Sequence, residues 1–128
     1  MQYHDISFPA VSGRSVPSGS LQAFKAEFFK ALGHPVRIRI LELLVTGERS
    51  VQELQEALAL DQPIVSQHLA SLRAKNIVKA RKEGPTVRYT VRVALIGELL
   101  AVARRIFDSQ LIDSQTMLRE LRREGRRR

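Results

Sequence analysis

Apolar and polar positions follow a helical spacing through the middle of the chain. In the segment that begins at Asp61, Val65, Leu69 and Leu72 fall on one narrow stripe of a helix. Asp61 is a good N-cap residue, and Pro63 suits the first turn, where its missing N–H would have had no helical partner. The pattern predicts a short helix with a sharply defined start and one buried face.

The opposite face of this predicted helix is polar but carries no acid. It combines amides, a hydroxyl and a guanidinium with small side chains, whereas a merely solvated helix more often carries Glu and Lys pairs. Amides and hydroxyls at the start of such a helix can reach base edges in a nucleic-acid groove. An ordinary amphipathic helix is the alternative. The residues of this face are Gln62, Pro63, Ser66, Gln67, Ala70, Arg73 and Ala74.

A second short helix is predicted immediately before the first. Apolar residues recur at positions 51, 54, 57 and 58, Ser50 is a good N-cap, and Glu53 completes a capping box. Only Leu60 and Asp61 separate the two helices. Two short helices joined so closely form a helix-turn-helix, in which the second helix enters the major groove of DNA.

Two β-type runs follow, at 77–83 and 87–92, on either side of the turn-forming residues 84–86. A hairpin placed directly after a recognition helix is a wing. The pattern therefore predicts a mainly α fold with a small β-hairpin wing, a winged helix-turn-helix.

Several segments together resemble the ArsR/SmtB family of winged helix-turn-helix repressors. They are ALGHPVRIRILELL, ERSVQEL, VSQHLASLRAKNIV, and the spacing of Gly84, Val87 and Tyr89. They occur in the family's order and cover most of the chain, from about Phe24 to Leu111. The resemblance implies a dimeric, prokaryotic, operator-binding regulator.

Apolar helices are also predicted at both ends of this region. The first covers 20–32 and has phenylalanines on its apolar stripe; the last covers 93–110 and has a wide apolar seam. A domain this small has little core left to fill, so these faces suggest a dimer interface; the alternative is that they cap the monomer core. The expected interface residues are Phe24, Phe28, Leu99, Leu100, Ala103 and Phe107.

Between them, Pro35 opens a further helix that is predicted to end at Gly47. Its Ile38, Leu41, Leu44 and Val45 are expected to face the core. His34 is interpreted as an N-cap or turn residue, and His68 as the acceptor or donor of a structural hydrogen bond.

Charge favours a polyanionic partner. The chain has 21 basic and 13 acidic residues, a net charge of +8. Residues 73–92 hold seven basic residues against Glu83 alone, and residues 119–128 hold six against two acids. We expect Arg73, Lys82, Thr86 and Arg88 to hold the DNA backbone, and Gln62, Ser66 and Gln67 to contact base edges, with an apolar contact from Pro63.

The chain of 128 residues is predicted to form one domain at 20–112, with a flexible arm at 1–19 and a basic extension at 113–128. Leu111, Met117, Leu118 and Leu121 could extend the last helix or form another turn, and the arginines after Gly125 are expected to be mobile. The start lacks the features of a signal peptide, and no apolar run approaches the length of a membrane span, so we expect a cytoplasmic protein without membrane contact.

The metal sites of the resembling family are not expected here. The chain has no cysteine, and Ser50 and Gln52 stand where thiolate sensors carry their sulfurs. The zinc sensors carry Asp, His and Glu ligands on the last helix, at places that this chain fills with Val93, Leu95, Ile106 and Ser109. We therefore expect no metal and no cofactor, although Tyr3, His4, Asp5, Asp108 and Asp113 remain as donors that could assemble across a dimer.

The same residues bear on other functions. The sequence has no nucleophile elbow, phosphate-binding glycine loop or HExxH motif, so an enzyme is not expected. The alternative hypothesis is a winged helix that binds RNA or docks onto another protein. Because aromatic residues make up 5% of the chain and only Tyr89 lies in the wing or recognition helix, a stacking platform for single strands is lacking and duplex DNA is preferred. The sequence leaves open whether a small molecule or a partner protein acts as an effector.

Overall fold

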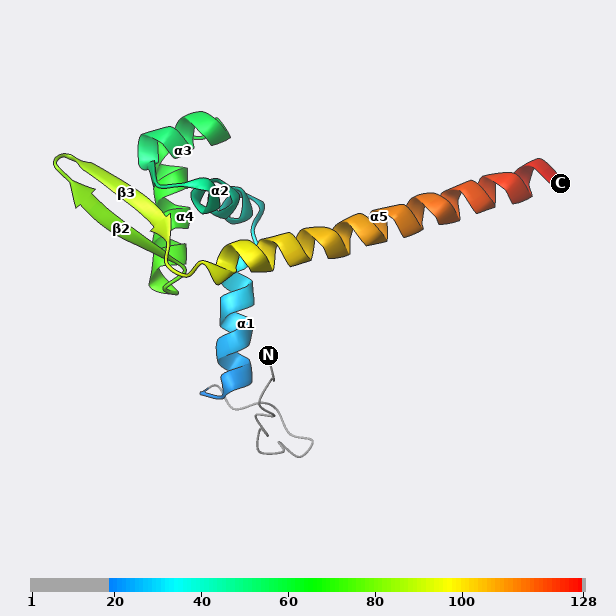
Figure 1. Cartoon of the computed structure of the whole chain (residues 1–128), viewed down its shortest axis with the longest axis horizontal. Coiled ribbons are helices and arrows are strands. Elements are labelled where there is room, and N and C mark those ends of the chain that lie inside the picture. The colour runs from blue at the N-terminus through cyan, green and yellow to red at the C-terminus, as the bar shows by residue number, and fades with distance from the viewer. Residues whose placement is uncertain (1–18, 128) are drawn as a thin grey trace.

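The computed structural model describes residues 19–127, so positions 1–18 of the predicted arm, with Tyr3, His4 and Asp5, lie outside the described residues. Three helices and the hairpin lie together, a further helix near the N-terminus points away from them, and the last helix extends as a long rod (Figure 1). The elements are α1 (Leu21–Leu32), α2 (Pro35–Thr46), β1 (Arg49–Ser50), α3 (Val51–Leu58), α4 (Gln62–Ala74), β2 (Val78–Glu83), β3 (Thr86–Val91) and α5 (Leu95–Arg127).

The helix starts follow the capping residues of the sequence. Ser20 and His34 each accept a hydrogen bond from a backbone N–H of the helix that follows, α1 and α2. Ser50 and Glu53 form the predicted capping box of α3. Asp61 occupies the N-cap of α4 as predicted, but its side chain accepts no cap hydrogen bond. The start of α4 is therefore set by the backbone of Asp61 and by Pro63 in the first turn.

The core lies between α2, α3, α4 and β2. The predicted stripe of α4 is confirmed, since Val65, Leu69 and Leu72 have no exposed surface. The expectation for α2 was partly wrong: Leu41 and Leu44 are buried with Ile40, whereas Ile38 is 38% and Val45 43% exposed. The fully buried set is Ile40, Leu41, Leu54, Val65, Leu69, Leu72, Ile77 and Val78.

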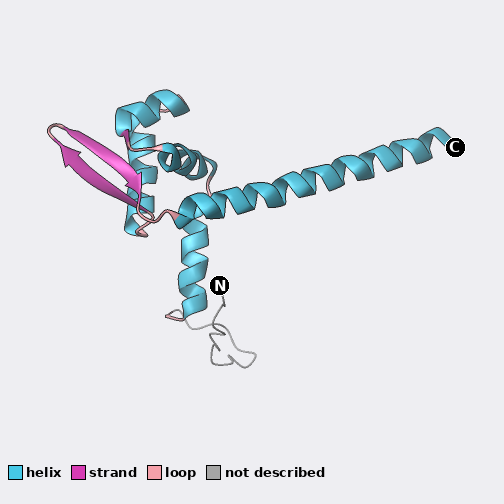
Figure 2. Cartoon of the chain, in the orientation of Figure 1, coloured by secondary structure: helices cyan, strands magenta, loops and turns pink. Residues whose placement is uncertain are grey.

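The wing is part of a three-stranded antiparallel sheet of order β1-β3-β2; Figure 2 shows its two long strands beside the helices. The predicted hairpin turn was one residue too long, because Thr86 already pairs with Glu83. Gly84 has a φ of +60° and precedes Pro85, which fits the first central position of a type II′ turn. The pairing of Arg49 in β1 with Tyr89 in β3 was not predicted.

The last helix is longer than expected. It runs without a break through the predicted boundary at residue 112 and ends at Arg127, so the basic extension continues α5, which was one of the two alternatives for its apolar residues. Only the start of α5 packs on the body, where Ile96 is buried and Leu99 and Leu100 pack against the core. Within residues 19–127, no helix combines the length and apolar character needed to cross a membrane.

Candidate nucleic-acid interface

The exposed face of α4 carries the predicted base-contacting residues. Gln62, Pro63 and Gln67 are exposed, and Ser66 is half-buried. Gln62 Nε2 donates to Ser66 Oγ at 2.8 Å, which joins two of these side chains across one helical turn. This hydrogen bond limits the rotamers of both groups in the absence of DNA.

A hollow of about 310 Å³ lies beside these residues, between α3, the start of α4 and the tip of the wing. Gln62 and Thr86 line it, as predicted site residues, together with Gln52 and Gln55 of α3. The two α3 amides were missed by the sequence analysis. Their spacing of three residues on the polar face of the first helix was the available signal.

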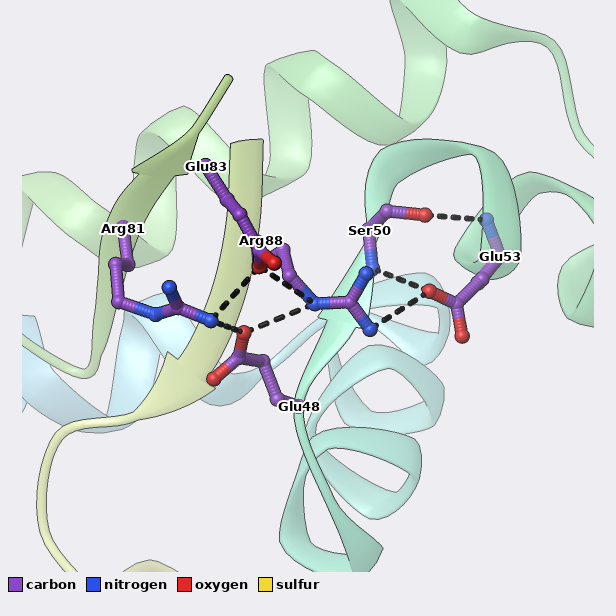
Figure 3. Close-up of polar contacts among 6 residues, drawn as sticks. All are labelled: Glu48, Ser50, Glu53, Arg81, Glu83 and Arg88. Atoms are coloured by element: carbon purple, nitrogen blue, oxygen red, sulfur yellow. Dashed lines mark hydrogen bonds and ion pairs between the residues drawn. The ribbon is translucent and has the colours of Figure 1, made fainter. Parts of the chain in front are cut away.

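The wing is tied to the body by an ion-pair network (Figure 3). Arg88 Nε lies 2.9 Å from Glu48 Oε1, and Arg88 Nη2 lies 3.1 Å from Glu53 Oε1. Arg81 pairs with Glu48 and, at 3.0 Å, with Glu83. The Arg88 side chain is only 29% exposed, so its guanidinium is already engaged by two carboxylates. This arrangement places Arg88 as a residue that positions the wing.

Contacts within the ion-pair network shift the pKa values of its own charged groups. The hydrogen bond from Arg81 lowers the pKa of Glu48 and raises the pKa of Arg81. The backbone N–H of Ser50 donates to Glu53 and lowers the pKa of that carboxyl. All three groups therefore carry full charge at neutral pH.

Other cations remain available at the surface. Arg73 and Lys82 are exposed, and neither has an ion pair within the described part of the chain. Lys75 lies 3.5 Å from Glu27 of α1. Arg73 and Lys82 are thus the predicted backbone-contacting side chains whose charge the protein does not itself neutralise.

Behind the recognition face, a small polar cluster joins α2 to α4. Arg37 Nε donates to His68 Nδ1 at 3.1 Å, and Arg37 Nη1 donates to the backbone oxygen of Ala31 at 3.2 Å. The rings of His34 and His68 have centroids 4.3 Å apart. Burial lowers the pKa of His68, assisted by the charges of His34 and Arg37. The expectation of a structural hydrogen bond at His68, and of an N-cap at His34, is confirmed.

The predicted interface residues divide into two sets. Phe24 and Phe107 are 69% and 60% exposed, so they offer apolar surface. Phe28, Leu99 and Leu100 are partly buried against the core, so part of each side chain serves the monomer. Ala103 is half-buried and lines a groove of about 450 Å³ between α2 and α5, with Ile38, Glu42, Val45, Gly97, Leu100, Ala101, Arg104 and Phe107.

Possible metal donors are sparse in the described region. Within residues 19–127, no three His, Cys, Asp or Glu side chains come together. Asp108 and Asp113 both lie on the exposed part of α5. The expectation of a protein without the usual metal sites stays a prediction.

A closely joined helix pair with an exposed second helix, followed by a hairpin, defines the class of winged helix-turn-helix proteins. The model of bacterial regulatory proteins of the arsR family matches residues 34–80. The HTH-type transcriptional regulator Rv0081 of Mycobacterium tuberculosis is 46% identical over 109 residues, which is 84% of this chain and 96% of that protein. The chain belongs to the ArsR/SmtB family of transcriptional regulators.

Solved structures agree with this assignment. The crystal structure of Rv0081 has a TM-score of 0.69 at 47% identity and covers 73% of this chain and 95% of that one. A homodimeric winged helix-turn-helix DNA-binding domain of Mycobacterium bovis has a TM-score of 0.67 at 30% identity, covering 78% and 93%. The biofilm growth-associated repressor of Xylella fastidiosa is 36% identical over 85 residues, 66% of this chain and 75% of that protein.

Proposed function

We propose that this protein is a homodimeric repressor that binds a palindromic DNA operator through α4 and the wing. The observation that carries the proposal is the hydrogen-bonded pair of Gln62 and Ser66 on a helix face without acids. Amide and hydroxyl groups can donate to and accept from base edges, and a neighbouring carboxylate would repel the phosphates.

Each predicted DNA-binding residue has a role in this proposal. Gln62, Ser66 and Gln67 contact base edges, and Pro63 meets a thymine methyl group. Arg73, Lys82 and Thr86 hold the phosphates on either side. Arg88 is proposed as a further phosphate contact, and its ion pairs with Glu48 and Glu53 hold the wing against the segment before β1 and against α3.

A homodimer is expected to bind a palindromic operator. A two-fold axis presents two copies of α4 to two half-sites, and this symmetry is mirrored in the operator. The homodimeric M. bovis domain supports this assembly, and the X. fastidiosa relative, named a repressor, supports the direction of control. The expected interface includes Phe24, Phe28, Leu99, Leu100, Ala103 and Phe107.

A footprint on the DNA upstream of the protein's own gene tests the proposal. We expect protection of an inverted repeat, and binding of that duplex far tighter than binding of a scrambled duplex, a single strand or a structured RNA. Equal affinity for the RNA would support the rival RNA-binding function. Failure to bind any nucleic acid would support a protein-docking module.

We further propose that repression is not relieved by the family's usual metals. No cysteine is present, and the last helix carries Leu95 and Ile106 at two of the zinc-ligand places. Zinc, nickel, cobalt and arsenite should therefore leave the protein–DNA complex intact. Stoichiometric binding of one of them with about a tenfold loss of operator affinity, near 1.4 kcal/mol of coupling, would contradict this.

A further inference from the structure

The last turns of α5 differ in charge from the rest of that helix. Residues 95–118 hold three acids and two arginines, whereas residues 119–128 hold six arginines and two acids. Neither stretch contains a lysine. The positive charge of the helix is therefore concentrated at the end that projects from the other elements, and this end lies at the opposite side of the molecule from the wing (Figure 1).

Four of these arginines share one face of the helix. Arg119, Arg122, Arg123 and Arg126 follow each other at intervals of three, one and three residues, which places them within an arc of about 100° around the helix axis. The two acids of this segment, Glu120 and Glu124, fall outside the arc. The four arginines form a basic face without a carboxylate.

The chain does not neutralise this basic face. All four arginines are exposed, and within residues 19–127 no carboxylate forms an ion pair with any of them. Arg81 and Arg88 of the wing, in contrast, are both paired with Glu48. Like charges that lie three and four residues apart on a helix repel each other. An anionic partner would relieve this repulsion.

A simpler role for these arginines is stabilisation of the helix end. Cations near the C-terminus of a helix interact favourably with the helix dipole, but the effect is confined to the last turn. Arg119 and Arg122 precede the last turn of a helix that ends at Arg127. The dipole therefore accounts for the end of the basic face and not for the whole of it.

The chemistry of the basic face suits phosphate groups. A guanidinium binds two phosphate oxygens through parallel N–H donors, whereas a lysine offers only a compact point charge. Duplex DNA held by α4 would also keep phosphates at a high local concentration around the rest of the same protein. Among polyanions, duplex DNA is therefore the favoured partner.

We propose that the basic face binds the phosphate backbone of the DNA that flanks the operator. From Leu95 to Arg119 the helix spans roughly 36 Å, about one turn of DNA, which carries the face beyond the half-site that α4 of the same subunit reads. Contacts with phosphates add affinity without sequence specificity. The inference rests on the DNA binding of the proposed function and adds a second contact surface to it.

The length of the DNA tests this proposal. The inverted repeat alone is compared with the same repeat extended on each side by two turns of random sequence, about 20 base pairs. The full-length protein should bind the extended duplex about tenfold or more tightly than the repeat alone at about 0.1 M salt.

A pair of double variants assigns the gain to the basic face. Arg122→Gln with Arg123→Gln should lose most of the gain and bind the repeat alone as the wild type does. On the extended duplex its salt slope should be shallower by about 0.9 for each lost contact. Lys30→Gln with Arg105→Gln removes the same charge from exposed positions elsewhere and should keep the gain. Circular dichroism should show equal helix content, because glutamine and arginine have similar helix propensities.

The outcomes separate this inference from the proposed function. Wild-type protein that binds neither duplex would overturn both. Wild-type protein that binds the repeat but gains nothing from the flanks would overturn only the flanking contact, as would a gain that survives in the Arg122→Gln, Arg123→Gln variant. If the flanks add nothing and the wild type but not this variant binds vesicles of phosphatidylcholine and phosphatidylserine, the basic face contacts an anionic membrane surface instead.

Discussion

The Nε–H of Arg37 donates a hydrogen bond to Nδ1 of His68 at 3.1 Å and joins α2 to the back of the recognition helix. His68 can accept this bond only when Nδ1 carries no proton. Protonation would set an N–H against the guanidinium, so the contact requires the neutral imidazole. The position of α4 is therefore coupled to the charge of His68.

Acid should destabilise the fold through His68. Its pKa in the folded state is lowered, chiefly by burial. The unfolded chain therefore takes up a proton first as the pH falls below about 6.5, the ordinary histidine value. Stability is fully present above that pH and is lost toward the folded-state pKa, by at most about 1.4 kcal/mol per pH unit. Urea titrations at pH 7.5 and 5.5 measure the loss.

His68→Asn keeps an acceptor near the Nδ1 position and cannot titrate, so the loss over this pH range should shrink. His34→Asn retains an N-cap residue but removes one of the smaller causes of the lowered pKa of His68, so it should reduce the loss less than His68→Asn does. An unchanged pH dependence in His68→Asn would show that another group causes it.

Base contact by the amides of α4 predicts a loss that depends on DNA sequence. Gln62→Ala or Gln67→Ala should cost about 1 to 3 kcal/mol on the operator and little on random duplex. Gln115→Ala on α5, a glutamine remote from α4, is the control and should change neither. Equal losses of affinity on both duplexes would mean that these residues contact the DNA backbone and not the bases.

Phosphate contact by Lys82 predicts an effect on salt dependence. For the wild-type dimer, log K should fall with log salt with a slope on the order of −5 or steeper. Lys82→Gln should make that slope shallower by about 0.9 for each of the two subunits. Lys30→Gln on α1 is the control. A slope that Lys82→Gln does not change would place the wing tip away from the phosphates.

The ion-pair network predicts that Arg88 matters for stability more than Arg81. Arg88 is 29% exposed and bridges two elements, whereas Arg81 is 57% exposed and screened by water. Thermal unfolding should show a larger drop in melting temperature for Arg88→Ala than for Arg81→Ala. The reverse order would mean that Arg88 is held more loosely than its contacts indicate.

The turn of the helix-turn-helix contains a strained alanine. Ala59 caps α3 with a φ of +55°, a left-handed conformation that disfavours a β-carbon. Ala59→Gly should raise the free energy of unfolding by about 0.5 to 1 kcal/mol. The control, Ala57→Gly, lies inside α3 and should lower it by about the same amount. Denaturation of both variants by urea measures the difference.

The sequence alone determined the parts of this protein that depend on neighbouring residues. The buried stripe of Val65, Leu69 and Leu72 follows from helical spacing, and the start of α3 follows from Ser50 and Glu53. The hairpin follows from β-type residues around Gly84. Because these interactions lie within a few residues of each other, the pattern specifies them before the chain folds.

The tertiary structure decided the contacts between residues that lie far apart in the chain. Spacing on α2 could not separate Ile40, which is buried, from Ile38 and Val45, which border the groove, because all three are apolar and α5 comes 50 residues later. Arg88 was predicted only as a phosphate ligand, and the pairing of β1 with β3 added a partner that the sequence did not indicate, Glu48 at 2.9 Å. The sequence does not show which partner a charged side chain will have after folding, because a guanidinium binds carboxylate and phosphate alike.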